Sequence, residues 1–183
     1  MTKENVKREI YSWIKTLVFA LIIVFLVRNF LFSPTVVSGE SMSPTFEKDD
    51  KVLINKLSDI DRFDIVVFDA PDEDSFYIKR VIGLPGDTIE VKDDILYING
   101  EAMEEPYLEE SKKSNNLNFN FTADFTLQEL TGEVSVPEDS IFVLGDNRIN
   151  SKDSRFFGFI ANEAIIGEVK FRYFPFSDMG VPK

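Results

Sequence analysis

Two residue types that carry much of enzyme chemistry are missing from this 183-residue chain: it contains no Cys and no His. Without Cys the chain has no disulfides and no thiolate metal sites, and without His it lacks the commonest metal ligand. We therefore expect no bound metal and no other cofactor, and the apolar core must stabilise the fold. A Ser-His-Asp or Cys-His active site is excluded as well.

Long apolar runs are also scarce, and the longest lies near the N-terminus. Residues 16–27 carry no charge, but as a helix they span only about 18 Å. If the charged ends of Lys15 and Arg28 reach toward the membrane surfaces, the apolar stretch extends over 10–32 and can cross a hydrocarbon core of about 30 Å. We therefore predict a transmembrane anchor at 10–32.

The residues on either side of this stretch predict its orientation. Basic residues precede it and acidic ones follow it, so 1–9 should be a cytoplasmic tail and 33–183 an extracellular domain on a single-pass membrane protein. A cleavable signal peptide is the alternative, with Val37-Ser38-Gly39 as a weak cleavage site. The bulky residues at 30–32 favour an anchor that is retained.

The net charge of −12 is unevenly distributed. The first 39 residues carry five Lys or Arg and two Asp or Glu, which leaves −15 on the rest of the chain. Such a surface repels nucleic-acid phosphates and anionic lipid headgroups. We expect no nucleic-acid partner, and we expect membrane lipid to be contacted through apolar side chains.

After residue 36 the sequence changes to short segments rich in β-branched residues and separated by turn signals, which predicts a mostly β domain. Pro85-Gly86 suits a type II turn and Asn99-Gly100 a hairpin. Residues 104–135, rich in Glu, Asn and Thr, are predicted to be an insert outside the catalytic core. The expected strands are 51–54, 64–68, 76–82, 88–91, 95–98, 140–144 and 165–174.

With His and Cys absent, the remaining route to a nucleophile is a Ser or Thr activated by an unprotonated Lys. Ser41 is the favoured nucleophile because it lies in the segment 37–45, a few residues after the apolar run. The nine residues from Phe32 to Ser41 span at most about 30 Å, so this serine must stay near the outer membrane surface.

Lys79 is the favoured base. An ordinary lysine has a pKa of about 10.4, so only about one in a few thousand is neutral near pH 7, and burial is needed to change that. On a strand, Lys79 shares a face with Tyr77 and Val81, which predicts apolar neighbours. Arg80 then needs a carboxylate on the opposite face, either Asp146 or Asp153. The alternative is that Lys79 points into solvent from an edge strand.

A second polar cluster, 145–158, follows the predicted strand 140–144. It suits either a surface loop or a buried polar network. In the second interpretation Asp153 pairs with Arg155, and Ser151 orients a lysine amine by a hydrogen bond.

Several segments together resemble the conserved boxes of the type I signal peptidases, or leader peptidases, of the peptidase S26 family. Their order and the chain length are similar to the short, single-anchor Gram-positive type. The resemblance covers residues 10 to about 172 except the insert. The segments are 41–45 (Ser-Met-Ser-Pro-Thr), 51–56, 77–87, and 145–148 (Gly-Asp-Asn-Arg) with Ser151, Asp153, Ser154, Arg155 and Gly158.

The resemblance implies a membrane-bound serine endopeptidase that cleaves signal peptides from secreted preproteins after small residues, at Ala-x-Ala sites. It implies a core of antiparallel β-sheets with a small inserted subdomain. Ser41 would be the nucleophile and Lys79 the general base, Ser151 would position Lys79, and Asp153 with Arg155 would hold the loop against the core.

The chain departs from the family at Gly39. Proteobacterial members carry a hydroxyl residue two positions before the nucleophile and use it as an oxyanion donor. Here a backbone N–H near Gly39 would have to replace it, alongside the N–H of Ser41; losing one donor typically costs about 100- to 1,000-fold in rate.

Two other functions are weighed against this one. The SOS-response repressors also use Ser and Lys on a similar β fold, but they are soluble and cleave themselves. The other possibility is a membrane-tethered β domain that binds without catalysis. The apolar stretch argues against the first, and the presence of both Ser41 and Lys79 argues against the second.

Overall fold

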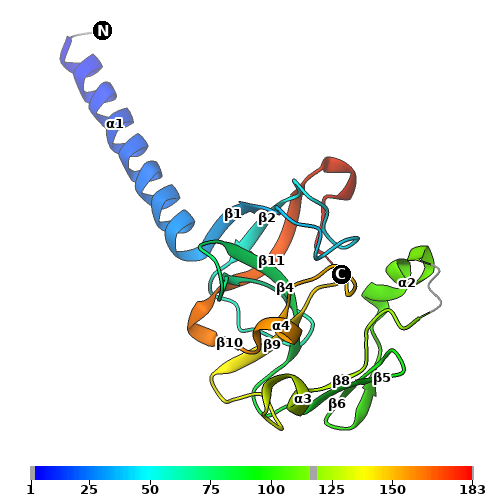
Figure 1. Cartoon of the computed structure of the whole chain (residues 1–183). Coiled ribbons are helices and arrows are strands. Elements are labelled where there is room, and N and C mark those ends of the chain that lie inside the picture. The colour runs from blue at the N-terminus through cyan, green and yellow to red at the C-terminus, as the bar shows by residue number, and fades with distance from the viewer. Residues whose placement is uncertain (1–2, 116–118, 183) are drawn as a thin grey trace.

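The computed structural model describes residues 3–115 and 119–182. A long N-terminal helix leads into a domain of two antiparallel sheets, with the chain termini on different parts of the molecule (Figure 1). The prediction of a mostly β fold of antiparallel sheets behind an apolar N-terminal helix is confirmed.

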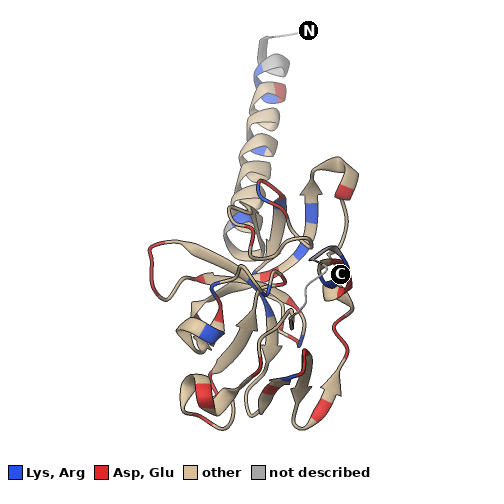
Figure 2. Ribbon diagram, turned by 45° about the vertical axis from the view of Figure 1, so that its right-hand side comes forward, with Lys and Arg blue, Asp and Glu red and all other residues tan. Residues whose placement is uncertain are grey.

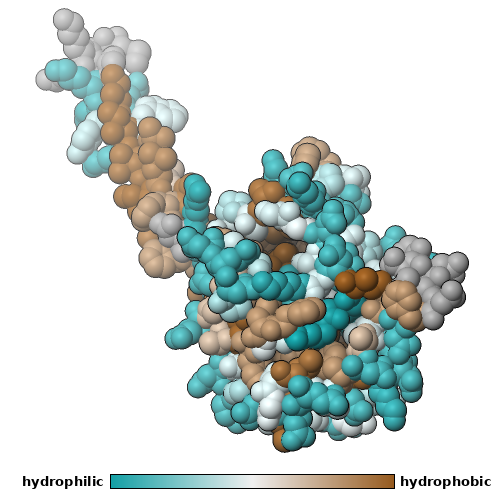
Figure 3. Space-filling model, viewed as in Figure 1, coloured by the Kyte–Doolittle hydropathy of each residue, from teal (hydrophilic) through white to brown (hydrophobic). Residues whose placement is uncertain are grey.

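The N-terminal helix α1 (Lys3–Leu26) stands away from the domain. Its segment Lys7–Leu26 is long and apolar enough to cross a membrane, and none of it is buried against the rest of the chain. Figure 3 shows the apolar side chains running along its length. Helical structure continues as a π-helical turn, Val27–Leu31, and ends where the chain enters β1, so Phe32 of the predicted 10–32 span belongs to a strand. Pro34 prevents the helix from continuing through Ser33, because a proline disfavours helix in the residue before it, and it is tolerated on the edge strand β1.

The larger sheet has seven strands in the order β1-β2-β11-β3-β4-β9-β10, and every neighbouring pair is antiparallel. Its strands are β1 (Phe32–Val36), β2 (Lys51–Asn55), β3 (Ile65–Asp69), β4 (Phe76–Gly83), β9 (Ser140–Leu144), β10 (Ile160–Ala161) and β11 (Ile165–Phe174).

The smaller sheet has the order β7-β6-β5-β8 and lies at the end of the domain away from α1 (Figure 1). It begins at β5, ahead of the insert predicted at 104–135. Asn99 and Gly100 both have positive φ, 54° and 80°, in the tight turn that was predicted there. Its strands are β5 (Ile89–Lys92), β6 (Ile95–Ile98), β7 (Glu101–Met103) and β8 (Phe125–Thr126).

Short helices fill the connections. They are α2 (Glu109–Asn115), α3 (Leu127–Thr131), α4 (Ser154–Phe157) and the 3-10 turns Pro106–Leu108, Asn162–Ala164 and Phe176–Asp178. A capping box starts α3: the Thr126 hydroxyl accepts from the Glu129 N–H, and the Glu129 carboxylate accepts from the Thr126 N–H.

The apolar core is divided among three clusters, and one of them holds the segment that contains Ser41. Met42 and Phe46 are completely buried there against Val52, Ile54 and other residues of β2, β3 and β11. The turn after β1 is therefore attached to the large sheet by two anchors on either side of Ser43–Thr45, and this attachment fixes the nucleophile candidate relative to β4.

Candidate active site

Ser41 lies in a turn that is tied to the loop after β9. The Ser41 carbonyl accepts from the backbone N–H of Asn147 at 3.0 Å. The Asn147 side-chain amide donates to the Glu40 carbonyl at 3.1 Å. Two segments more than 100 residues apart in sequence are therefore joined beside the serine, and the position of one depends on the other.

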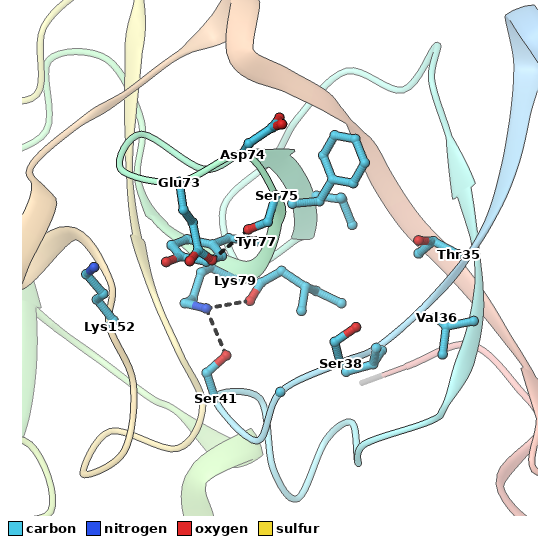
Figure 4. A pocket seen from close by; sticks show the side chains of 15 residues that line it. Thr35, Val36, Ser38, Ser41, Glu73, Asp74, Ser75, Tyr77, Lys79 and Lys152 are labelled. Atoms are coloured by element: carbon cyan, nitrogen blue, oxygen red, sulfur yellow. Dashed lines mark hydrogen bonds between the residues drawn. The ribbon is translucent and has the colours of Figure 1, made fainter.

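Lys79 approaches Ser41 from β4, and in Figure 4 the two side chains point toward one another. The Lys79 Nζ atom donates to Ser41 Oγ at 2.8 Å and to the Ile78 carbonyl at 3.0 Å. The Nζ atom also lies 5.0 Å from the centre of the Tyr77 ring. Only 3% of Lys79 is exposed, so the predicted apolar setting is present and the solvent-facing alternative is wrong.

The environment of Lys79 changes its protonation. Burial lowers the pKa of Lys79 to about 8, and the negative charges of Asp153 and Asp146 oppose the shift without cancelling it. At that pKa roughly one amine in ten is neutral near pH 7, compared with one in a few thousand for an ordinary lysine. A neutral amine can accept the proton of a hydroxyl at hydrogen-bond distance.

Beside these two residues lies a groove of about 730 Å³. One wall consists of the end of β1 and the residues up to Ser41, and the other consists of residues 73–79 (Figure 4). Strand β4 pairs with β3 along Phe76–Arg80 but with β9 only from Arg80 onward. The edge of β4 that carries Lys79 is therefore open to the groove, where an extended peptide can pair with it.

On the opposite face of β4, Arg80 is buried with a carboxylate as its counter-charge. Its guanidinium donates to the Asp146 carboxylate at 2.9 and 2.6 Å and to the Phe63 carbonyl at 2.8 Å. Of the two carboxylates predicted for Arg80, the structure uses Asp146. Asp146 Oδ2 also accepts from the Thr45 hydroxyl at 2.6 Å, which adds a second link between this loop and the Ser41 segment.

The supporting residues are placed as follows. Asp153 is completely buried; it pairs with Arg155 at 2.8 Å, caps α4 and accepts from the Gly145 N–H at 3.0 Å. Ser151 is buried nearby, but among the described residues its hydroxyl has no hydrogen-bond partner, so the predicted bond to Lys79 is not formed. A Cβ added at Gly145 would lie 2.1 Å from Ser151 Oγ and 2.5 Å from the Ser41 carbonyl oxygen, which places Ser151 beside the Ser41 segment.

The protein family described as signal peptidase, peptidase S26, matches residues 10–174, which is most of the chain. The chain belongs to the peptidase S26 family. The matched range includes Ser41, Lys79 and the loop from Gly145 to Arg155, and it also includes the 104–135 segment that was predicted to lie outside the core.

Individual relatives in the family agree over nearly the whole chain. The signal peptidase I of Bacillus caldolyticus is 49% identical over 181 residues, covering 96% of each chain. Signal peptidase I S of Bacillus subtilis strain 168 is 44% identical and covers 98% of each. The crystal structure of a signal peptidase I from Enterococcus faecalis V583 is 47% identical with a TM-score of 0.59, covering 61% of this chain and 97% of that one.

Gly39, the position where the chain departs from the proteobacterial pattern, lies exposed in the groove wall. A Cβ added there would meet nothing within 4 Å, so the glycine is not required by packing. Among the described residues, the backbone N–H groups of Gly39 and Ser41 donate to no protein acceptor. Both remain free to donate to a ligand in the groove.

Sequence reasoning missed the contacts of Asn147 and Arg148. Both lie in the Gly-Asp-Asn-Arg segment, so their position was noted but their partners were not. Asn147 holds the Ser41 turn, as described above. Arg148 is 2% exposed and pairs with Glu105, which comes from the region taken to be an insert. No local pattern at Glu105 indicated this.

Across the described residues, no group of three or more Asp or Glu is arranged to hold a metal ion.

Proposed function

We propose that this protein is a membrane-anchored signal peptidase that cleaves signal peptides from secreted preproteins, with Ser41 as the nucleophile and Lys79 as the general base. The observation that carries the assignment is the 2.8 Å contact between Lys79 Nζ and Ser41 Oγ at the edge of an open groove. Membership of the S26 family and the named relatives supply the substrate class.

The chemistry needs Lys79 in its neutral form. The amine accepts the proton of Ser41 Oγ while that oxygen attacks the scissile carbonyl, and the resulting ammonium then protonates the departing amine of the mature protein. In the second half the amine takes a proton from water, the hydroxide attacks the acyl-enzyme ester, and the ammonium returns the proton to Ser41. The pKa of about 8 supports both steps, because the group gains and loses a proton near neutral pH.

Stabilisation of the oxyanion is assigned to backbone groups. Among the described residues the Ser41 N–H and the Gly39 N–H have no protein acceptor, and both residues line the groove, so we assign these groups to the developing negative charge. The conformation of the wall is supported by the Asn147 contacts described above, since these hold the Glu40 and Ser41 carbonyls.

The substrate binds as an added strand on the open edge of β4 in this proposal. Side chains of an extended peptide alternate, so the first and third residues before the cut face the same wall. Val37, Val67 and Ile78 contribute apolar side chains to the lining of the groove. These side chains already occupy space beside the nucleophile, which suits Ala-sized residues at both positions.

The membrane arrangement is part of the proposal. Helix α1 is the retained anchor with residues 1–9 in the cytoplasm, and 33–183 is the extracellular domain. In Figures 1 and 2 the end of β11 and the loop after it reach the level of the lower part of α1; Phe174, which ends β11, and Phe176 in the loop are exposed. At the far end of the domain, the charged residues in view are mainly Asp or Glu (Figure 2). The apolar loop therefore suits contact with the outer lipid surface, while the acidic end faces solvent.

The test is cleavage of a preprotein with an Ala-x-Ala site by the full chain in detergent. Ser41→Ala and Lys79→Ala should each abolish cleavage, while Ser38→Ala and Lys152→Ala, matched residues of the same groove, should leave it within about twofold. Replacing Ala by Phe at either recognised substrate position should also block cleavage. Activity that survives Lys79→Ala would refute the assigned base. Self-cleavage of the chain without preprotein would favour the repressor-like alternative. Absence of any cleavage by the unmodified protein would favour a membrane-tethered domain that binds without catalysis.

A further inference from the structure

The strongest unexplained feature is a buried ion pair between the two sheet regions. The side chain of Arg148 is fully buried and that of Glu105 is 7% exposed. Arg148 Nη2 donates to Glu105 Oε1 at 2.5 Å and Nη1 donates to Oε2 at 3.4 Å. Arg148 also donates to the Thr122 hydroxyl at 3.1 Å. Both partners come from the segment between β7 and β8, outside the groove.

The other side of Arg148 holds the loop that supports the nucleophile. Its Nε donates to the Gly145 carbonyl at 3.0 Å, and its own carbonyl accepts from Arg155 at 2.8 Å. Between Gly145 and Arg148 lies Asn147, whose backbone N–H donates to the Ser41 carbonyl. A continuous set of contacts therefore runs from Glu105 through Arg148 to the turn that carries Ser41.

Tyr107 lies between this ion pair and the face of β4 that carries Arg80. Its hydroxyl donates to Glu105 Oε1 at 2.7 Å, and its ring lies 3.9 Å from the guanidinium of Arg80. Burial raises the pKa of Tyr107, so the phenol keeps its proton and remains a donor. Glu105 thus accepts hydrogen bonds from both Arg148 and Tyr107, while Asp146 accepts from Arg80.

We propose that Glu105 is a positioning residue for the peptidase reaction: it fixes Arg148 and thereby keeps the loop 145–148 pressed against the Ser41 turn. The physical reason is that a guanidinium cannot stay buried without its counter-charge. If Glu105 loses its charge, Arg148 must move toward water, and it pulls the Gly145 carbonyl and Asn147 with it. A displacement of about 1 Å at a nucleophile can lower a rate by about 100-fold.

This inference rests on the proposed function, so its test includes a readout that needs no cleavage. Hydrogen exchange of peptides covering 140–151 should be faster in Glu105→Gln than in the unmodified full chain. Glu104→Gln is the matched control, because Glu104 is the exposed neighbour and, among the described residues, forms no hydrogen bond or ion pair with the loop. If the unmodified protein cleaves no preprotein, the proposed function fails, and hydrogen exchange still tests the positioning.

With preprotein as substrate, Glu105→Gln should lower kcat by about 10- to 100-fold with KM within about twofold, because the open edge of β4 that pairs with the substrate does not depend on Arg148. Glu105→Asp, which keeps the charge, should recover part of kcat. The rising limb of the pH profile should also move to higher pH. The groups that face Lys79 are Ser41, the Tyr77 ring, Asp146 and Asp153. A displaced loop lets water reach the amine, which weakens the effect of burial and raises the pKa of Lys79.

A merely structural role predicts a different pattern: a lower Tm, with an unchanged kcat per folded molecule and an unchanged pH profile. If Glu105→Gln does not fold, Tyr107→Phe removes one hydrogen bond to Glu105 and keeps the ring beside Arg80; it should lower kcat by about threefold to tenfold in the same manner. Folded variants with unchanged kcat, unchanged pH profile and unchanged hydrogen exchange would overturn the proposal.

Discussion

The two faces of β4 bury neighbouring cations in opposite ways. On one face Arg80 has Asp146 at 2.6 and 2.9 Å and the Phe63 carbonyl at 2.8 Å. On the other, Lys79 has a serine hydroxyl and a carbonyl within 3.0 Å, and no carboxylate forms a hydrogen bond with it among the described residues. Burial without such a partner lowers the pKa of Lys79. Alternation along one strand thus separates a structural cation from a titrating one.

The largest expected effect comes from removing the uncompensated cation. Lys79→Met should lower cleavage by about 1,000-fold or more and still stabilise the fold. The folded-state pKa, about 8, lies below the unfolded value of 10.5, so the unfolded chain binds more protons between these pH values. The buried ammonium therefore costs about 3 kcal/mol below pH 8, and that cost disappears as pH rises to 10.5.

Thermal or urea unfolding at pH 7 and pH 10.5 measures this change. The gain in unfolding free energy of Lys79→Met should be present at pH 7 and nearly gone at pH 10.5. Lys152→Met is the control, since Lys152 is an exposed lysine paired with Asp72 in the same region. Equal gains at both pH values would show that Lys79 is not destabilised by its charge.

On the compensated face the sign reverses. Asp146→Asn removes the counter-charge of Arg80 while keeping the side-chain shape, so the unfolding free energy should fall by about 3–5 kcal/mol. Denaturant titration checks this against Asp69→Asn, a change at an exposed position on β3. A loss below about 1 kcal/mol would mean that Arg80 is not held by Asp146 in the way described.

Two glycines near Ser41, Gly39 in the groove wall and Gly145 in the loop after β9, extend the comparison. Gly145→Ala places a methyl group 2.1 Å from Ser151 Oγ and 2.5 Å from the Ser41 carbonyl, so kcat should fall by about 100-fold. Gly39→Ala meets nothing within 4 Å and keeps its N–H, so kcat should stay within about threefold. Steady-state kinetics measures kcat for both variants, and circular dichroism checks that they fold. Equal effects would contradict the distinction between a packed loop and an open groove wall.

Much of the fold could be predicted because local patterns encode it. All seven predicted strands are present within two residues of their expected ends, and the alternation that put Lys79 and Arg80 on opposite faces followed from the strand period. Strands β7, β8 and β10 were missed because two or three residues are too few to show alternation, and β1 was missed because it begins at Phe32, inside the predicted apolar anchor.

The candidate site could be predicted only in part. Elimination and the resemblance predicted Ser41 and Lys79, and the structure places these two side chains in contact. The contact between Glu105 and Arg148 was not predicted, because it spans 43 residues and nothing near Glu105 in sequence indicates it. The unpartnered Ser151 hydroxyl was also beyond prediction, since a rotamer depends on packing and not on sequence spacing.

The most direct test of the central claim is the pH dependence of kcat/KM for preprotein cleavage by the unmodified full chain, since this quantity reports the pKa values of the free enzyme. A neutral Lys79 acting as base predicts a rising limb with its midpoint at about pH 8. A midpoint near the ordinary lysine value of about 10.4, or a rate independent of pH through this range, would contradict the assignment of a buried, uncompensated lysine as the general base.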